Sequence, residues 1–376
     1  MATTVLEGAR ALAPKIAARA AEIEAARRVP LDLIKELTAA GCFRMLVPRS
    51  HRGGGLDLMS AMRVFEELSR ADASVGWTVM IGAGAWRDLS GLPRATFDAL
   101  YADPDVIIGG VFSPAGVAVP VDKGYRVSGR WAFASGCQHC HWLYGNCVED
   151  SGGVPQVRTV VFSPADVEIE DTWSVSGLCG TGSHHFAAHD VFVEAARTCL
   201  PFSDPPCVDE PLVRIPPPPV FALAIGSAAI GIAQGALDDI LALSASKVPL
   251  LSRGALATNP LFQHQLGATD ANVRAARTLL YSDATAAWTT AEAGGTFTPD
   301  HRARIRATAT WVATTAASVV DAAYGSGGGS SLYSDNPLQR RFRDIHALTQ
   351  HFLVKRDTFT TAGAVLAGAE VDLTVF

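Results

Sequence analysis

The stretch PFSDPPCVDEPLVRIPPPP, residues 201–219, contains eight prolines and separates two unlike parts of the chain. Proline fixes its own φ angle and has no amide hydrogen, so such a density of prolines disrupts both helices and central strands. The sequence therefore predicts a linker at this point rather than a helix or a strand.

The part after the linker reads as helical. Apolar residues recur there with the period of an amphipathic helix, which predicts four long helices that pack as a C-terminal four-helix bundle within residues 206–376. The four stretches are residues 221–245, 260–287, 301–324 and 337–368.

The part before the linker changes in composition and in hydrophobic period near residue 105. Residues 105–205 contain short runs rich in Val, Phe, Tyr and Trp, separated by Gly, Pro and Asp, which predict an antiparallel β domain of sandwich or barrel type. The runs are residues 125–128, 130–135, 157–162 and 186–193. Residues 1–104 are Ala-rich and helical in period. We therefore predict an α+β chain of three domains in this order.

Composition narrows the classes of protein to which this sequence can belong. Of the 376 residues only 18% are charged, which suggests that apolar surface is buried between subunits, with the apolar region 221–240 as a candidate contact. The net charge of −6 argues against a nucleic-acid partner. The apolar run 220–232 is too short to span a bilayer, and no signal peptide is evident. Seven cysteines suggest reduced thiols, so we expect a cytoplasmic protein without a membrane partner.

Several local motifs, in this order, resemble the acyl-CoA dehydrogenase superfamily over nearly the whole chain. The pieces that carry the resemblance are Val47-Pro48, Gly53-Gly54-Gly55, FEELS (residues 65–69), GRWAFASG (129–136), WSVSGLCGTGS (173–183), DVFV (190–193) and RFRD (341–344). The resemblance implies a helical N-terminal domain, a middle β domain and a C-terminal four-helix bundle that together bind a flavin.

Other pieces resemble the flavin-dependent monooxygenase branch of that superfamily. This branch includes the oxygenase component of p-hydroxyphenylacetate hydroxylase, dibenzothiophene monooxygenase and polyketide hydroxylases. The pieces are residues 112–116, 135–142, 180–183 and 336–351. The resemblance implies a two-component system, in which a separate NAD(P)H:flavin reductase supplies FMNH2 or FADH2. O2 would form a flavin C4a-hydroperoxide that hydroxylates an aromatic or polycyclic small molecule, and the enzyme would be a homotetramer or at least a dimer.

The absence of a carboxylate base distinguishes this branch from the dehydrogenases. Removal of a substrate α-proton needs a base within hydrogen-bond reach, and the family pattern puts a Glu eight residues after Asp344. This chain has Phe352 there, and the alternative family position, residues 243–247, holds no carboxylate either. An oxidase or dehydrogenase with an atypical base, Asp238 or Asp239, stays as the alternative. A flavoprotein scaffold without activity is a third interpretation.

His351 is the main catalytic candidate. The resemblance places it near the reactive C4a–N5 edge of the flavin, and histidine titrates across neutral pH. A hydrogen-bonded, inert core histidine is the alternative. Ser135 is the second catalytic candidate, as a hydroxyl for flavin N5 or O4 or for a substrate oxygen. Phe133 would pack on the flavin ring, and the turn with Gly180, Thr181 and Ser183 would face it.

Two further groups complete the predicted site. Arg253, Phe262 and Gln263, with the Gly-rich run 325–331, would hold the flavin phosphate or nucleotide across a subunit interface. Trp77, Trp86, Phe112 and His139 would line a bulky, apolar substrate pocket. Between Trp77 and Trp86 no residue is a histidine, so the substrate-binding His of some branch members has no counterpart there.

A run of cysteines and histidines, Cys137, His139, Cys140, His141 and Cys147, has the residue types of a metal site. We interpret the segment as one β strand, in which 137, 139 and 141 share a face. Because no second ligand pair follows at zinc-site spacing, we expect no metal.

Overall fold

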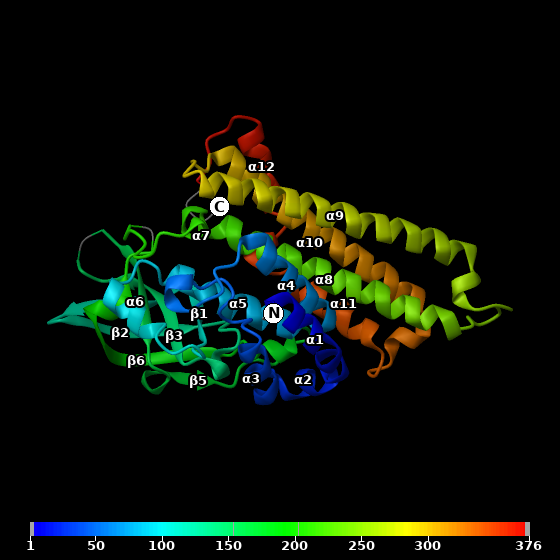
Figure 1. Cartoon of the computed structure of the whole chain (residues 1–376), viewed down its shortest axis with the longest axis horizontal. Coiled ribbons are helices and arrows are strands. Elements are labelled where there is room, and N and C mark those ends of the chain that lie inside the picture. The colour runs from blue at the N-terminus through cyan, green and yellow to red at the C-terminus, as the bar shows by residue number, and fades with distance from the viewer. Residues whose placement is uncertain (1–3, 153, 202, 373–376) are drawn as a thin grey trace.

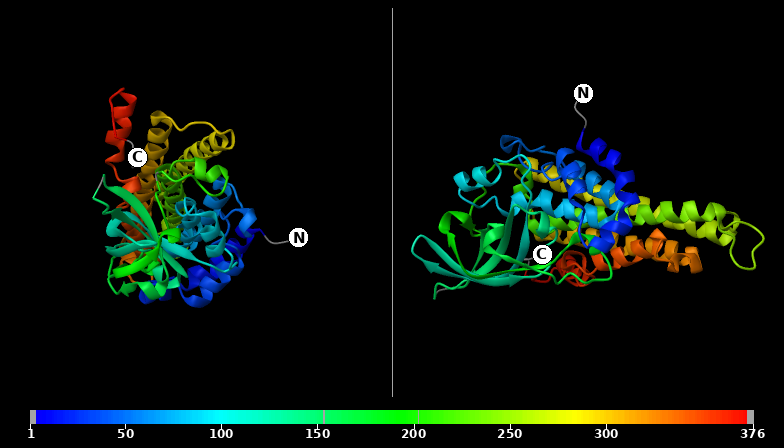
Figure 2. Two further views of the ribbon diagram at one scale, coloured as in Figure 1. Left: turned by 90° about the vertical axis from the view of Figure 1, so that its left-hand side faces the viewer. Right: turned by 90° about the horizontal axis from the view of Figure 1, so that it is seen from below.

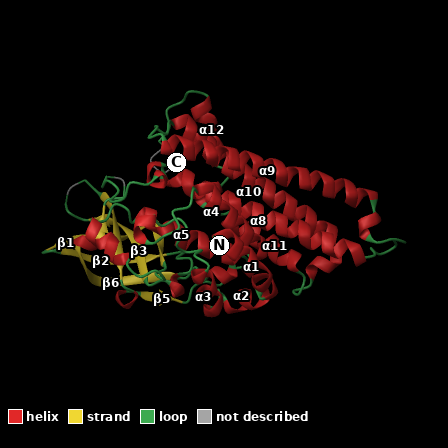
Figure 3. Ribbon diagram, in the orientation of Figure 1, coloured by secondary structure: helices red, strands yellow, loops and turns green. Residues whose placement is uncertain are grey.

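The computed structural model describes residues 4–152, 154–201 and 203–372. A β sheet lies at one end of an elongated molecule and long helices run away from it towards the other end (Figure 1). Strands are confined to the sheet end, and the N-terminal helices lie between the sheet and the long helices (Figure 3).

The N-terminal region consists of helices around one central helix. α5 (Ala73–Asp88) is buried along nearly its whole length, and Asp72 caps it by accepting a hydrogen bond from the Val75 amide at 3.1 Å. The surrounding helices are α1 (Val5–Ala18), α2 (Ala20–Ala26), α3 (Leu31–Ala39), α4 (Leu58–Ala71) and α6 (Arg94–Leu100). α5 therefore has both ends and most of its sides in contact with other parts of the fold.

The middle region is one seven-stranded sheet of order β5-β6-β2-β1-β3-β4-β7. Its strands are β1 (Ile108–Val121), β2 (Gly124–Trp131), β3 (Trp142–Glu149), β4 (Gln156–Phe162), β5 (Glu168–Glu170), β6 (His185–Glu194) and β7 (Thr198–Cys199). Five of the six pairings are antiparallel, as predicted, but β1 and β3 are parallel, so the sheet is mixed. Trp131 stacks on Phe186 at 4.9 Å in its core.

The parallel pair results from the connection between β2 and β3. β2 ends at Trp131, not at Ser135 as predicted, because Phe133 adopts φ +66° and Gly136 φ +71°, which turn the chain out of the sheet. A 3-10 helix, Cys137–His139, follows, and β3 then starts at the same edge as β1. The interpretation of residues 137–147 as one strand was therefore wrong, and alternation does not place 137, 139 and 141 on one face.

The C-terminal region contains four long helices and a short terminal one: α8 (Pro217–Ser246), α9 (Pro260–Glu292), α10 (Pro299–Gly327), α11 (Pro337–Leu348) and α12 (Thr358–Leu366). The predicted linker is shorter than expected. It holds a one-turn helix, α7 (Pro211–Arg214), and its last three prolines form the first turn of α8, where a missing amide hydrogen costs little.

The last predicted helix, residues 337–368, is interrupted. α11 ends at Leu348, and a 3-10 helix, Phe352–Val354, separates it from α12. Arg306 of α10 donates hydrogen bonds to the carbonyls of Leu353 and Phe352, which holds the break in place. The break positions His351 in a loop rather than on a helix face.

α8 is the central helix of the C-terminal region. By length and composition it could cross a membrane, but 89% of its most apolar window is buried inside the fold. Gly231 allows close packing on α4, since a Cβ there would lie 2.2 Å from the Glu66 carbonyl. The apolar region 221–240 is thus mostly covered within the chain, by α4 and α10, and the prediction that it is an intersubunit contact was wrong. In the view from below, the sheet and the long helices extend in opposite directions (Figure 2).

Candidate active site

A chain of hydroxyl groups joins two loops of the sheet region to α5. The Trp77 indole N–H donates to Ser135 Oγ at 3.1 Å, Ser135 lies 2.7 Å from Ser183 Oγ, and Ser183 lies 2.7 Å from Thr181 Oγ1. Thr181 donates to the Leu178 carbonyl at 2.8 Å. We call Ser135, Ser183 and Thr181 the hydroxyl chain; all three side chains are buried.

Only one set of donor and acceptor roles is consistent along the hydroxyl chain. Each hydroxyl has a single hydrogen, and Thr181 uses its own on the Leu178 carbonyl. Ser183 then donates to Thr181, and Ser135 donates to Ser183. Since Trp77 can only donate, Ser135 has no hydrogen left but still has acceptor capacity.

His351 also contacts Trp77, and the centroids of the two rings are 5.5 Å apart. Its Nδ1 accepts a hydrogen bond from the Leu353 amide at 3.3 Å, which puts the ring hydrogen on Nε2. Burial and the nearby Arg306 guanidinium lower the pKa of His351 to about 4. His351 is therefore neutral at pH 7 and presents an N–H group at Nε2, instead of the titrating acid suggested by its residue type.

Phe133 is held in an unusual position for an apolar ring. Its backbone is in the left-handed region, and 69% of its surface is exposed. Its ring lies 6.1 Å from that of Trp173 and 6.2 Å from that of His185. Strain at a non-glycine residue of this kind persists where the surroundings enforce it, commonly at binding sites.

The structure places the remaining sheet-end candidates at different points. Gly180 packs on α2, since a Cβ there would lie 2.3 Å from the Ile23 side chain, so it supports the turn rather than facing outwards. His139 is buried on the 3-10 helix, and burial lowers its pKa to about 4. The Phe112 carbonyl on β1 accepts a hydrogen bond from Asn146 at 2.8 Å.

Trp86 does not lie next to Trp77. Nine residues of α-helix separate them by about 13 Å and turn their side chains to opposite faces of α5. Trp86 is buried, and its indole nitrogen has no partner among the described residues. Trp77 and Trp86 therefore do not line one common substrate pocket.

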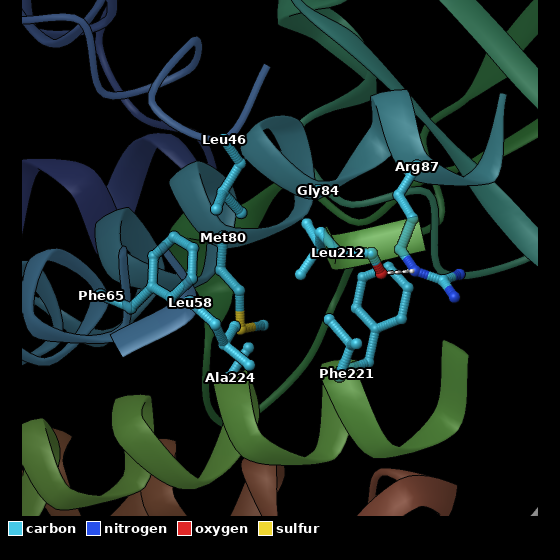
Figure 4. A pocket seen from close by; sticks show the side chains of 10 residues that line it. Leu46, Leu58, Phe65, Met80, Gly84, Arg87, Leu212, Phe221 and Ala224 are labelled. Carbon is cyan, nitrogen blue, oxygen red and sulfur yellow. Dashed lines mark hydrogen bonds between the residues drawn. The ribbon is translucent and has the colours of Figure 1, made fainter. Parts of the chain in front are cut away.

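An apolar pocket instead continues along the Trp77 face of α5. Met80 and Gly84, three and seven residues further on, lie on that face and meet α4 and α8 there (Figure 4). The side chains leave about 10 Å³ between them, so a larger molecule requires side chains to move. The lining residues are Leu46, Leu58, Phe65, Met80, Gly84, Arg87, Leu212, Val220, Phe221 and Ala224.

Arg87 is the charged residue in this lining, and the protein backbone holds it. It donates to the Leu212 carbonyl at 3.3 Å (Figure 4), and it also donates to the Ile215 carbonyl. Burial lowers its pKa to about 10. The pocket is therefore apolar in character, with its one guanidinium already bonded.

The predicted phosphate-binding group lies at the other end of the molecule. The loop between α8 and α9, with the exposed Arg253, and the loop after α10 both lie at the end of the long helices away from the sheet (Figure 1). Phe262 is buried in the first turn of α9. Lys247 connects the loops, since its ammonium donates to the Gly327 carbonyl at 2.5 Å and to Ser330 Oγ at 2.7 Å.

This second group is remote from the hydroxyl chain. α8 has 30 residues, so it is about 45 Å long. Sequence reasoning missed Lys247, Arg306 and Asp344, the last of which lies buried next to the loop of the hydroxyl chain. The signal for Asp344 was present, because it belongs to the motif used above to locate the missing Glu.

Comparison with known proteins supports the resemblance. Family models of the acyl-CoA dehydrogenase N-terminal and C-terminal domains match residues 3–88 and 223–356. A pigment production hydroxylase of Rhodococcus erythropolis is 32% identical over 98% of both chains. The chain belongs to the acyl-CoA dehydrogenase family.

The relatives also identify the branch. The oxygenase component of the FADH2-dependent resorcinol hydroxylase of a Rhizobium species is 30% identical and covers 93% of this chain and 91% of its own. The crystal structure of the 3-HSA hydroxylase from Rhodococcus sp. RHA1 matches with a TM-score of 0.91 and 27% identity, over 98% of both chains. Further relatives have monooxygenase names. This family member is a flavin-dependent monooxygenase that uses reduced flavin and O2, and the predicted fold and branch are confirmed.

Proposed function

We propose that this protein is the oxygenase component of a two-component system that hydroxylates an aromatic or polycyclic small molecule. A separate NAD(P)H:flavin reductase delivers FMNH2 or FADH2, and the reduced flavin supplies the electrons that activate O2. The observation that carries the proposal is the hydroxyl chain next to a neutral His351, with Phe352 at the position of the dehydrogenase Glu.

The residues at the sheet end fit a flavin ring. An exposed Phe133 beside Trp173 and His185 offers an apolar and aromatic surface for a planar ring. Nδ1 of His185 is buried without a partner among the described residues, which leaves a polar atom for a ligand to satisfy. Ser135, as an acceptor, suits the N5–H group that a reduced flavin carries.

His351 has the complementary role. A neutral imidazole that donates through Nε2 stabilises negative charge developing on an oxygen atom without transferring a full positive charge to the site. Trp77 contacts the His351 ring and donates a hydrogen bond to Ser135, so it links the two residues. Half-buried surroundings limit the access of water, which strengthens such a hydrogen bond.

The dehydrogenase alternative lacks a base in the structure as well. Asp238 is paired with Arg70 at 2.6 Å, and Asp239 with Arg341 at 3.0 Å. Phe352, at the family position of the Glu, is 52% exposed and cannot accept a proton. Both carboxylates on α8 therefore serve structural ion pairs.

The same proposal includes a cytoplasmic homotetramer. The second group of flavin-binding candidates, Arg253, Phe262 and the Gly-rich loop, lies too far from Phe133 to touch the same flavin within one chain. A flavin bound at both places therefore requires two subunits. Exposed apolar side chains on the long helices, Leu241, Leu279 and Trp311, offer contacts for such an assembly.

Single-turnover oxidation tests the function. Reduced FMN or FAD, mixed with the protein and ¹⁸O2, is expected to reoxidise with kinetics that differ from those of free flavin. Resorcinol serves as the first aromatic probe, and a product is expected to contain one ¹⁸O atom. Anaerobic incubation of the oxidised flavoprotein with butyryl-CoA is expected to leave the flavin oxidised. Unchanged reoxidation kinetics, or bleaching by butyryl-CoA, would contradict the proposal.

A further inference from the structure

The loop of residues 174–183, which carries Thr181 and Ser183, lies between three elements with almost no free space. A Cβ at Gly177 would lie 2.1 Å from the Arg343 carbonyl of α11. A Cβ at Gly180 would lie 2.3 Å from Ile23 of α2 and 3.0 Å from Ser74 of α5. The loop backbone is therefore packed directly on helices from both ends of the chain.

One peptide unit of this loop connects the hydroxyl chain to α11. The Leu178 amide donates to Asp344 Oδ1 at 2.7 Å, and the Leu178 carbonyl accepts from Thr181 at 2.8 Å. The same carbonyl accepts from the Trp173 indole at 3.2 Å. Leu178 itself adopts φ +53°, a left-handed conformation that is unfavourable for a non-glycine residue. The Asp344 hydrogen bond helps to hold it there.

Asp344 is also close in sequence to the other half of the site. α11 ends at Leu348, four residues after Asp344, and His351 follows three residues later. The His351 amide donates back to the Leu348 carbonyl at 3.0 Å, so the connection is a tight turn and not a free loop. A movement of Asp344 relative to the loop would therefore change the separation between the hydroxyl chain and His351.

The charges around Asp344 explain how a buried carboxyl is tolerated there. Burial, together with the neighbouring Asp72, raises the pKa of Asp344 to about 7, and burial also raises the pKa of Asp72. Arg340 and Arg343 act in the opposite direction, and Arg343 is itself bonded to Glu24 and to the Ser176 carbonyl. The other ionisable groups at this contact are Arg341, which is paired with Asp239, and the Cys179 thiol.

We infer that Asp344 is a positioning residue of the monooxygenase: it ties the Leu178 turn, and with it the hydroxyl chain, to the helix that leads to His351. Asp72 joins the same arrangement because it caps α5, the helix that carries Trp77. Asp344 touches neither the hydroxyls nor His351 in this role, so it acts through the geometry of the loop. The inference rests on the proposed function only for its effect on turnover.

Hydrogen exchange in the flavin-free protein tests the positioning directly. Asp344→Ala leaves the Leu178 amide without its acceptor, so exchange in the peptide covering residues 174–184 is expected to be faster by roughly tenfold or more. Asp344→Asn keeps a side-chain carbonyl, and exchange is expected to stay within about twofold of the wild type. Asp321→Asn is the matched control, because Asp321 binds α11 at His346 without touching the loop.

Turnover provides the second readout. In Asp344→Ala a larger fraction of the O2 consumed with reduced FAD is expected to appear as H2O2, while Asp344→Asn and Asp321→Asn behave like the wild type. If Asp344→Ala fails to fold, Asp344→Glu, which displaces the carboxyl by one methylene, is expected to give faster exchange and more H2O2 than Asp344→Asn. Equal exchange in Asp344→Ala and Asp321→Asn, or an Asn variant as impaired as the Ala variant, would overturn the inference.

The two readouts separate the inference from the proposed function. Exchange needs neither flavin nor substrate, so the expected exchange pattern with no oxygenase activity in any variant would refute the proposed function and leave the positioning role intact. Normal oxygenation with an unchanged exchange pattern in Asp344→Ala would refute the positioning role and leave the proposed function intact.

Discussion

The protonation state of His351 depends on its surroundings and not on its residue type. A free imidazole titrates near pH 6.5, but burial and Arg306 lower the pKa of this one to about 4. The Leu353 amide also selects the tautomer, since it occupies Nδ1. At neutral pH the side chain presents one N–H group and no positive charge.

The His351→Ala variant removes this N–H group. The variant should fold, because the change leaves only a small cavity at the edge of the bundle, and it should still bind reduced flavin. Product formation is expected to fall by roughly 10²–10³-fold, with H2O2 released instead, because a preorganised donor is lost. The measurement is product and H2O2 formed per O2 consumed. His346→Ala, which removes an exposed contact between α11 and Asp321 of α10, serves as the control. Wild-type coupling in His351→Ala would return His351 to a structural role.

Acid stability follows from the same lowered pKa values. His139 and His351 have pKa values of about 4 in the folded protein, below the value near 6.5 of an unfolded chain. Between these values the unfolded chain binds more protons, so stability is expected to fall as the pH decreases from 6.5 towards 4. These two histidines should therefore lower the melting temperature between pH 7 and pH 5.

A variant assigns this acid effect to one residue. His139→Gln removes one titrating group, and its melting temperature should drop less between pH 7 and pH 5 than that of the wild type. An equal drop in both proteins would assign the acid sensitivity to other groups. Asp344 acts in the opposite direction, because its pKa is raised to about 7 and its protonated form is favoured on folding.

At the scale of elements, hydrophobic period predicted the long helices well and their interruptions poorly. The predicted helix 260–287 corresponds to α9, whereas the predicted helix 337–368 is broken after Leu348. The break depends on Arg306, which is distant in sequence, and no local pattern encodes it. The departure from the sheet at Phe133 depends likewise on the left-handed conformation of a residue that normally avoids it.

The sequence predicted residues of the candidate site but not the contacts among them, because those contacts also depend on residues that are distant in sequence. Ser135, Thr181, Ser183 and Trp77 were identified individually, and the structure brings them into one hydrogen-bonded chain with His351 beside it. Which hydroxyl donates to which follows only from their distances. The functional roles of these residues stay predictions. Trp86 shows the limit of the sequence argument, since proximity along a helix does not place two residues on one face.

Gly177 provides a test of how tightly the loop of residues 174–183 packs on α11. Gly177→Ala should destabilise the protein by about 1–3 kcal/mol, because a methyl group would meet the Arg343 carbonyl. Gly267→Ala, on the exposed face of α9 with nothing within 4 Å of its added Cβ, should stabilise it by about 0.5–1 kcal/mol. Urea unfolding of both variants measures the difference. Similar stabilities would show that the loop can move away from α11 without cost.

At the scale of the whole molecule, the order of the three parts followed from composition and period, but the way they join did not. Whether β3 runs parallel or antiparallel to β1 depends on the path of residues 132–141, and strand composition is the same in both cases. The predicted domain boundaries themselves stay a prediction.

The proposed tetramer determines the mass of the particle in solution. Light scattering is expected to show a particle of about four times the 39.5 kDa chain mass. Replacing Lys247 by Ala should weaken flavin binding if the loops at the far end of the bundle bind a neighbour's flavin, while the mass of the particle stays the same. A monodisperse monomer, or a monomer with full flavin affinity, would contradict the proposed tetramer.

The packing of residues 174–183 has a kinetic consequence for the newly made chain. This loop rests on Ile23 and on Asp344, residues more than 300 positions apart, so its final shape requires a contact of high sequence separation. Such contacts close late because the entropic cost of bringing distant segments together comes first. The sheet and the N-terminal helices can form during synthesis, but the hydroxyl chain cannot be held in place until α11 has left the ribosome. In refolding, catalytic competence should therefore appear with the slowest phase, after most secondary structure has formed.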